Sequence, residues 1–124
     1  MQVMVLLDAD YLCHTVVQAC RDQGFHVAST LKSHRCLYKQ GWKLTAGRYG
    51  QNLFRRRSTT PLIRAKPPGG VRYHYVDAGW LQVSTLGPLH LVCSRKGAAL
   101  KSLGLVTDDL ELSAAELIPT YEKR

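Results

Sequence analysis

Two acidic residues near the N-terminus are the first side chains of this sequence that could do chemistry on phosphate groups. Asp8 directly follows the apolar run Val3–Leu7, and Asp10 stands two residues further on, just before Tyr11. Carboxylates hold a divalent cation beside a phosphate only when several of them converge on it. Asp8 could equally be an ordinary acid at the end of a strand, and Asp10 a helix cap, so their role depends on the rest of the chain.

A second group of residues with a recognisable pattern lies near the C-terminus. Ser113 and Glu116 have the spacing of a capping box, which predicts the start of a helix. Tyr121 and Arg124 follow on that helix in the form Tyr-x-x-Arg. Taken alone, the pattern could be an ordinary amphipathic helix face.

Positive charge gathers in the middle of the chain. The sequence has 17 Lys and Arg against 9 Asp and Glu, a net charge of +8, and no acid occurs from Gln23 to Val76. A stretch of one sign repels itself, and a bound polyphosphate would relieve that repulsion. The stretch therefore predicts a surface that contacts phosphate groups, and composition alone does not decide between nucleic acid and an anionic membrane surface. Its densest cations, which we expect to bind DNA, are Arg55, Arg56, Arg57, Arg64 and Lys66.

The composition disfavours several other classes of protein. No apolar run approaches the roughly 20 residues of a membrane-spanning helix, and Val3–Leu7 lacks the flanks of a signal peptide. The four cysteines form no C-x-x-C pair. We therefore expect reduced thiols in a cytoplasmic protein, rather than disulfides or a zinc site.

A β-α-β unit must position the N-terminal acids. Val3–Leu7 has the length and composition of a buried strand, and the spacing of apolar residues predicts a helix over Tyr11–Gln23 with Asp10 as its cap. Phe25–Leu31 alternates like a second strand. A connection of this kind normally joins parallel strands.

The middle of the chain is rich in short strands separated by turn clusters. We expect a turn at Ala46-Gly47, a loop over Ser58–Pro68, and Trp42 and Trp80 in the core of this region. The predicted antiparallel strands are Cys36–Tyr38, Trp42–Leu44, Val71–Val76, Trp80–Thr85 and Leu89–Ser94.

The C-terminal part returns to an apolar strand, Leu103–Thr107, and then to a helix over Ala114–Arg124. Pro119 lies inside that helix and should kink or restart it. Asp108 and Asp109 lie between the strand and the helix, and we interpret them as turn and cap acids rather than as metal ligands.

In their order along the chain, these motifs resemble the catalytic domain of bacterial insertion-sequence transposases of the insertion-sequence-four type. Asp8 and Tyr11 match an Asp-x-Gly-Tyr motif, with Asp10 in the place of its Gly. Tyr121 and Arg124 match the start of a Tyr-x-x-Arg-x-x-x-Glu motif. The resemblance implies an α/β (α+β) fold, namely a partial RNase H-like fold with a β-rich insertion between the second catalytic Asp and the helix that carries the catalytic Glu.

The same resemblance divides the chain into three segments. Residues 1–31 would be the RNase H-like core segment with the catalytic Asp, residues 32–101 the basic β-rich insertion, and residues 102–124 the return strand with the start of the Glu-bearing helix. Because that helix must return beside the Asp strand, Leu103–Thr107 should lie in the same sheet as Val3–Leu7.

The chemistry that the resemblance implies is the metal-dependent cleavage and transfer of DNA strands. Asp8 would be a catalytic residue and a ligand of Mg²⁺ or Mn²⁺, in a centre of two divalent ions. Tyr121 and Arg124 would join the basic residues in binding transposon-end DNA, in a bacterial, nucleoid-associated transposase that could be a homo-oligomer. The family's first catalytic Asp and its Glu have no counterpart in the sequence, so we expect a fragment that is inactive alone.

Two alternatives stay open. Leu6-Leu7-Asp8-Ala9-Asp10 also resembles the acidic strand end of small PIN-like metal-dependent nucleases. That alternative requires Asp8, Asp10, Asp108 and Asp109 to converge on one cavity. The other alternative is a non-catalytic nucleic-acid-binding module, in which the basic middle of the chain carries the whole function.

Overall fold

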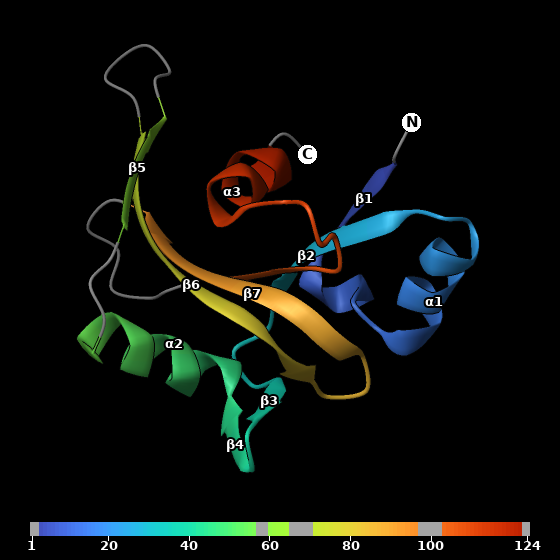
Figure 1. Ribbon diagram of the computed structural model, residues 1–124, viewed down its shortest axis with the longest axis horizontal. Helices are drawn as coiled ribbons and strands as arrows, with labels where there is room; N and C mark the ends of the chain where they lie inside the picture. Colours follow the sequence, from blue (N-terminus) through green and yellow to red (C-terminus); the bar gives the residue numbers. More distant parts are fainter. Residues whose placement is uncertain (1–2, 57–59, 65–70, 97–102, 123–124) are drawn as a thin grey trace.

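The computed structural model describes residues 3–56, 60–64, 71–96 and 103–122 (Figure 1). These residues form a mixed α+β fold, in which eight strands of the described chain make one sheet. The strands are β1 (Met4–Leu7), β2 (His26–Leu31), β3 (Cys36–Lys39), β4 (Trp42–Thr45), β5 (Thr60–Arg64), β6 (Val71–Val83), β7 (Gly87–Lys96) and β8 (Leu103–Thr107). The helices are the short 3-10 helix η1 (Ala9–Tyr11), α1 (His14–Asp22), α2 (Ala46–Arg56) and α3 (Ala114–Glu122).

The predicted β-α-β unit is present at the N-terminus. Strand β1 pairs in parallel with β2, with Met4 opposite His26. The helix between them begins later than expected, at His14, and Cys13 rather than Asp10 is its cap residue. Asp10 lies in η1 and its carboxylate pairs with Lys32, so it is not available to cap a helix.

The order of the sheet is β1-β2-β8-β7-β6-β3-β4, and β5 also pairs with β6. Strand β8 runs antiparallel between β2 and β7, so that Val106 lies opposite Ser29 on one side and Leu91 on the other. The prediction that Leu103–Thr107 shares a sheet with the N-terminal strand is therefore confirmed, with β2 between the two.

The middle of the chain forms antiparallel strands as expected, with three differences. Residues 46–56 form α2 instead of a turn, because Tyr49 and Leu53 bury one side of the helix against the sheet. Part of the predicted loop is strand β5, which pairs with β6. The two strands predicted over residues 71–85 are one long strand, β6, with an irregularity in its pairing between Asp77 and Gly79.

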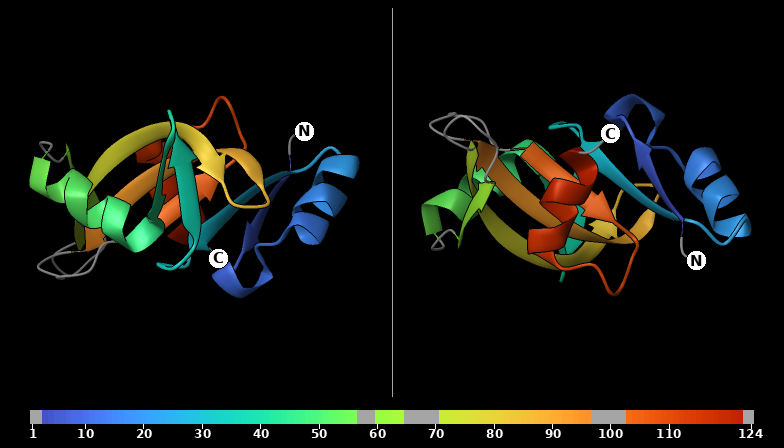
Figure 2. Two further views of the ribbon diagram at one scale, coloured as in Figure 1. Left: turned by 90° about the horizontal axis from the view of Figure 1, so that it is seen from below. Right: turned by 90° about the horizontal axis from the view of Figure 1, so that it is seen from above.

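Two hydrophobic clusters lie on the two faces of the sheet. Neighbouring residues along a strand point to opposite faces, so Val27 and Val106 belong to one cluster while Ala28 and Leu105 belong to the other. Helices α1 and α2 contribute to the first cluster and α3 to the second. Figure 2 shows α3 on the opposite side of the sheet from α2.

The capping box of α3 is confirmed. The backbone N–H of Glu116 donates to Ser113 Oγ at 3.2 Å, and the backbone N–H of Ser113 donates to Glu116 Oε1 at 3.2 Å. These hydrogen bonds with Ser113 lower the pKa of the Glu116 carboxyl. The helix continues through Pro119 to Glu122. Within the described parts of the chain, no helix is both long enough and apolar enough to cross a membrane.

Candidate functional site

Asp8 stands directly after β1, where the chain leaves the sheet and turns into η1. The backbone N–H of Tyr11 donates to the Asp8 carbonyl oxygen at 2.9 Å, which closes this turn. Helix α3 reaches the same place from the other end of the chain. The Tyr121 hydroxyl donates to the carbonyl oxygen of Leu7 at 2.8 Å and lies 3.5 Å from Thr30 Oγ1. Tyr121 of the C-terminal motif therefore contacts the residue that precedes Asp8.

Tyr121 is part of the core of this site. Its side chain is 4% exposed and packs in the cluster beneath α3 with Leu117 and Ile118. A ring in this position fastens the helix to the sheet, and it presents no exposed face for the DNA contact that the resemblance implied. Arg124, the second residue of that motif, lies outside the described residues.

The other acids that the nuclease alternative requires do not gather around Asp8. Asp10 forms an ion pair with Lys32, which lowers the pKa of the Asp10 carboxyl. Asp108 accepts a hydrogen bond from the backbone N–H of Val27 at 2.9 Å and another from Arg21 Nε at 3.2 Å. Asp10 thus pairs with a lysine of the fold, and Asp108 joins the C-terminal part of the chain to β2 and α1.

Asp109 likewise accepts a hydrogen bond from the backbone N–H of Glu111 at 2.9 Å, as expected for a turn acid. Among the described residues, no three His, Cys, Asp or Glu side chains come close enough together to hold a metal ion. The acids required by the PIN-like alternative therefore do not converge. For the same reason, the described residues do not by themselves fit a centre of two Mg²⁺ or Mn²⁺ ions at Asp8.

Helix α2 carries the described part of the predicted DNA-binding cluster. Because Tyr49 and Leu53 face the sheet, Arg48, Gln51 and Arg55 lie on the exposed side of the helix, one above the other along its axis. Of the other predicted residues, Arg56 ends α2 and Arg64 ends β5, while Arg57 and Lys66 lie outside the described residues.

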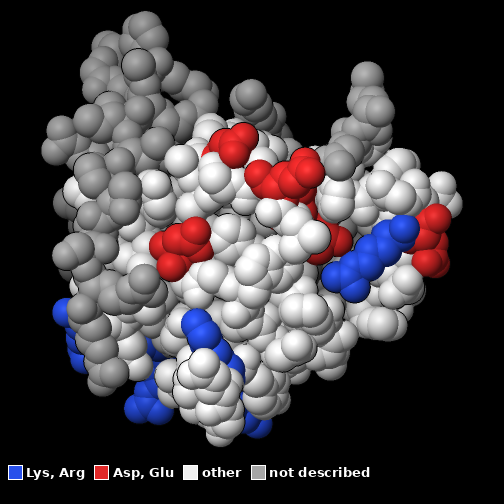
Figure 3. Space-filling view, viewed as in Figure 1, with Lys and Arg blue, Asp and Glu red and all other residues white. Residues whose placement is uncertain are grey.

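Several cations outside α2 are engaged within the fold. Arg21 pairs with Asp108, Arg35 donates to the carbonyl oxygens of Leu12 and Ser84, and Arg95 lies over the Phe54 ring. In the part of the chain that the structure describes, the side chains of Lys39, Arg48 and Arg55 make no ion pair. On the face that Figure 3 shows, most of the visible cations gather at one edge, over α2 and the β3–β4 hairpin, whereas acids lie near α3 and toward α1.

Sequence reasoning missed the position of Trp80. Trp42 packs against Tyr49, with 5.1 Å between ring centroids, in agreement with a core role. Trp80 is 39% exposed, so the prediction that it belongs to the core is wrong. The signal that could have found it is Gly79 inside a strand pattern, because an isolated glycine there often marks a β-bulge that redirects the side chains that follow.

Comparisons of this chain with family models, with curated proteins and with solved structures found no match.

Proposed function

We propose that this chain is a DNA-binding segment of the catalytic domain of an insertion-sequence transposase, with Asp8 in the position of that family's second catalytic Asp. The observation that carries the proposal is the 2.8 Å hydrogen bond between the Tyr121 hydroxyl and the Leu7 carbonyl oxygen. The Asp-x-x-Tyr and Tyr-x-x-Arg motifs lie at opposite ends of the sequence. A contact between Tyr121 and the residue before Asp8 is what a single active-site region would require.

The arrangement of the strands supports an RNase H-like core as part of this proposal. A parallel pair, β1 and β2, is joined through α1, and Asp8 follows the first of the two strands. After the antiparallel β-rich region, β8 returns to pair with β2 and leads into α3. That helix packs over β2 and β8 on the same sheet.

The exposed side of α2 supports DNA as the partner. Arg48 and Arg55 have no acidic neighbour within the helix, whose sequence contains no Asp or Glu. Guanidinium groups bond phosphate oxygens two at a time, and contacts to phosphates hold DNA without reading its sequence. The partner that we propose is transposon-end DNA, bound by a protein that works as a homo-oligomer when complete.

DNA binding rather than cleavage is the activity that we expect from these 124 residues. Purified protein supplied with Mg²⁺ or Mn²⁺ should bind duplex DNA but neither nick nor join it, and Asp8→Ala should leave binding unchanged. Supercoiled plasmid and labelled oligonucleotide substrates measure both activities. Metal-dependent cleavage that disappears in Asp8→Ala or Asp108→Ala would favour the PIN-like alternative, and failure to bind duplex DNA at low salt would contradict the proposal.

The lack of an acidic cluster among the described residues favours the non-catalytic module as the second candidate function. The DNA on either side of the coding sequence separates the two. An upstream frame that encodes a strand ending in Asp, together with a downstream frame that places a Glu four residues beyond Arg124, would support the transposase. Flanking DNA that encodes neither would support a module that binds nucleic acid and has no catalytic role.

A further inference from the structure

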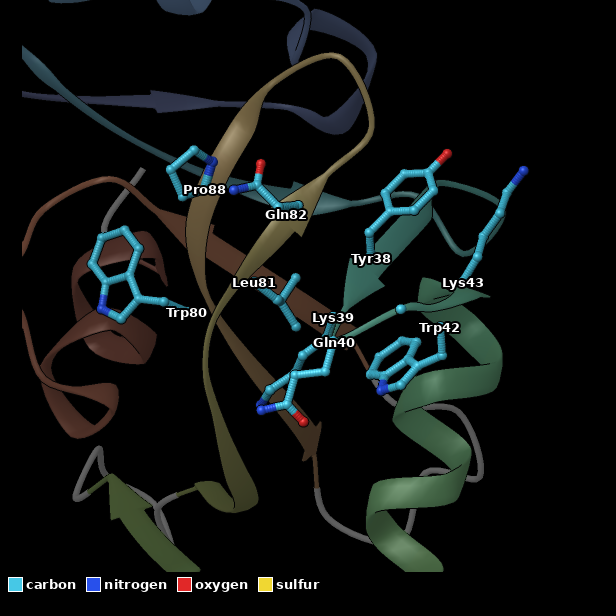
Figure 4. Close-up of a pocket in the computed structure, with 10 residues that line it drawn as sticks. Tyr38, Lys39, Gln40, Trp42, Lys43, Trp80, Leu81, Gln82 and Pro88 are labelled. Carbon is cyan, nitrogen blue, oxygen red and sulfur yellow. The ribbon is translucent and has the colours of Figure 1, made fainter.

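A second surface, distinct from the end of β1, lies on strands β4, β3, β6 and β7, on the face of the sheet opposite to the cluster that α2 covers. Strands β4, β3, β6 and β7 carry a row of side chains that are register partners, Lys43 opposite Tyr38, Tyr38 opposite Gln82 and Gln82 opposite Pro88. Trp80 lies two residues from Gln82 on the same side of β6. We call these five residues the open sheet face. They line a shallow hollow of about 700 Å³, and Figure 4 shows Gln82 and Pro88 between the rings of Trp80 and Tyr38.

A β-bulge turns Trp80 and Gln82 outward. Before the bulge, Val76 and Ala78 face the cluster on the α2 side, whereas after it Leu81 and Val83 face that cluster. One extra residue in β6 therefore exchanges the two faces of the strand. Without it, Trp80 would point into the core.

Three residues hold the bulge and the indole ring in place. Asp77 Oδ1 accepts a hydrogen bond of 2.9 Å from the backbone N–H of Gly79, whose φ is +74°. The same oxygen lies 2.6 Å from His90 Nε2. The His90 ring in turn stacks beneath Trp80, with 5.8 Å between centroids and 25° between planes. The exposed indole is thus supported from below, and binding a ligand on its outer face requires little ordering of the ring.

Lysines border the hollow, and Arg21 and Asp108 line a neighbouring hollow that shares Trp80 and Pro88 with it. Lys43 Nζ lies 5.8 Å from the centre of the Tyr38 ring, and Lys39 also lines the hollow. None of the described residues that line it is acidic. Tyr38, like Trp80, is 39% exposed. Diagonal neighbours on adjacent strands lie about 7–8 Å apart, so the two rings are platforms for separate flat groups that belong to one ligand.

We propose that the open sheet face binds single-stranded nucleic acid, with bases stacked on Trp80 and Tyr38 and phosphates near Lys43. Unpaired bases offer aromatic faces to exposed rings on a sheet, whereas the bases of a duplex are already stacked on each other. Lys43 supplies positive charge for a phosphate backbone on this face. This inference goes beyond the proposed function and does not depend on Asp8 or on the arginines of α2.

The test compares an oligothymidine of about 15 nucleotides with a duplex of the same length, by fluorescence anisotropy with the full chain. Trp80→Ala and Tyr38→Ala should each weaken binding of the oligothymidine by roughly 5- to 100-fold, with little change for the duplex. Trp80→Phe should retain most of the affinity. The control is Leu103→Ala, because Leu103 is an exposed apolar side chain outside the open sheet face and its truncation should have no effect.

A second measurement does not depend on the stability of an alanine variant. The chain has two tryptophans, so saturating oligothymidine should quench wild-type tryptophan emission through Trp80. In Trp80→Phe only Trp42 remains, whose ring packs against Tyr49, so the quenching should be much weaker while anisotropy still reports binding. Absence of quenching in the wild type, or a folded Trp80→Ala with wild-type affinity for oligothymidine, would overturn the proposal. An equal loss of duplex affinity would also overturn it, because it would point to a general phosphate surface.

Discussion

Tyr121 and Leu7 lie 114 positions apart in the sequence, and the hydroxyl of the first donates a hydrogen bond of 2.8 Å to the carbonyl oxygen of the second. The contact is in the interior, since the Tyr121 side chain is almost wholly buried. It ties the C-terminal helix to the N-terminal strand at the point where Asp8 leaves the sheet. The Tyr121 hydroxyl therefore helps to fix the position of Asp8 relative to the helix, together with the packing of Leu117 and Ile118.

Tyr121→Phe should lower the free energy of unfolding by about 1 kcal/mol, since it removes this hydrogen bond and keeps the packing of the ring. Tyr121→Ala should cost about 3–5 kcal/mol, because it also leaves a cavity under α3. Urea denaturation followed by circular dichroism measures both values. Equal stability of wild type and Tyr121→Phe would show that the hydroxyl does not hold the helix.

Changing Arg55, Arg56 and Arg57 together to Ala should weaken binding to unrelated duplexes by similar factors, because phosphate contacts carry no base information. The log–log dependence of affinity on salt should flatten by roughly 0.9 for each phosphate that the variant no longer neutralises. Anisotropy titrations at several salt concentrations give this slope. The control is Arg21→Ala, whose guanidinium already pairs with Asp108 and should not contribute. An unchanged slope in the folded triple variant would make these arginines a solubilising face only.

Gly79→Ala should destabilise the protein by about 1–2 kcal/mol, because the φ of +74° at this position is strained for a residue with a side chain. Steric conflict is not the cause, since a Cβ atom at Gly79 would meet nothing within 4 Å. Gly79→Asn should be less destabilising, because asparagine tolerates a positive φ better than alanine does. Urea midpoints of the two variants test the comparison, and a Gly79→Ala protein as stable as wild type would argue against the bulge geometry.

Cys93 should resist alkylation in the folded protein, whereas the exposed Cys13 should react. Burial raises the pKa of the Cys93 thiol from its ordinary value of 9.0 to about 12, so the reactive thiolate is scarce at pH 8. Iodoacetamide labelling with mass spectrometry, with and without urea, measures this difference. Rapid labelling of Cys93 without urea would contradict its buried position.

The same raised pKa also affects stability. When the pKa of a thiol is higher in the folded state than in the unfolded state, the protonated thiol contributes to the free energy of unfolding. This contribution is fully present below pH 9 and is lost as the pH rises toward 12. The stability advantage of the wild type over Cys93→Ala should therefore be smaller at pH 10 than at pH 8. Urea denaturation of both proteins at the two pH values measures the difference.

The parts of the fold that sequence reasoning predicted are those whose signals are local. The apolar run before Asp8 and the Ser113–Glu116 capping box each specify an element within a few residues, and both are found in the structure. Helix α2 was missed because Ala46-Gly47 has the composition of a turn. The helix forms there because Tyr49 and Leu53 can pack against the sheet, a contribution that depends on tertiary structure.

The candidate sites show the same division. The place of Asp8 at the end of a strand follows from the apolar run directly before it. The positive charge around Arg55 likewise follows from a stretch of sequence without acids. The orientation of Trp80 depends on one extra residue in β6 and on a hydrogen bond between Asp77 and Gly79. A β-bulge adds one residue to a strand and so exchanges the buried and exposed positions after it. A sequence pattern that assumes strict alternation does not show where that extra residue lies.

The position of β2 in the sheet has a consequence for the kinetics of folding. This strand pairs with β1, its near neighbour in sequence, and with β8, where Ala28 lies opposite Thr107. The β3–β4 and β6–β7 hairpins close short loops, whereas joining β2 to β8 closes a loop that contains the whole middle of the chain. The entropy of closing a loop grows with its length, and contacts of large sequence separation slow folding. We therefore expect the antiparallel strands to assemble first, and the acid-bearing end of the sheet to be completed in the slowest step.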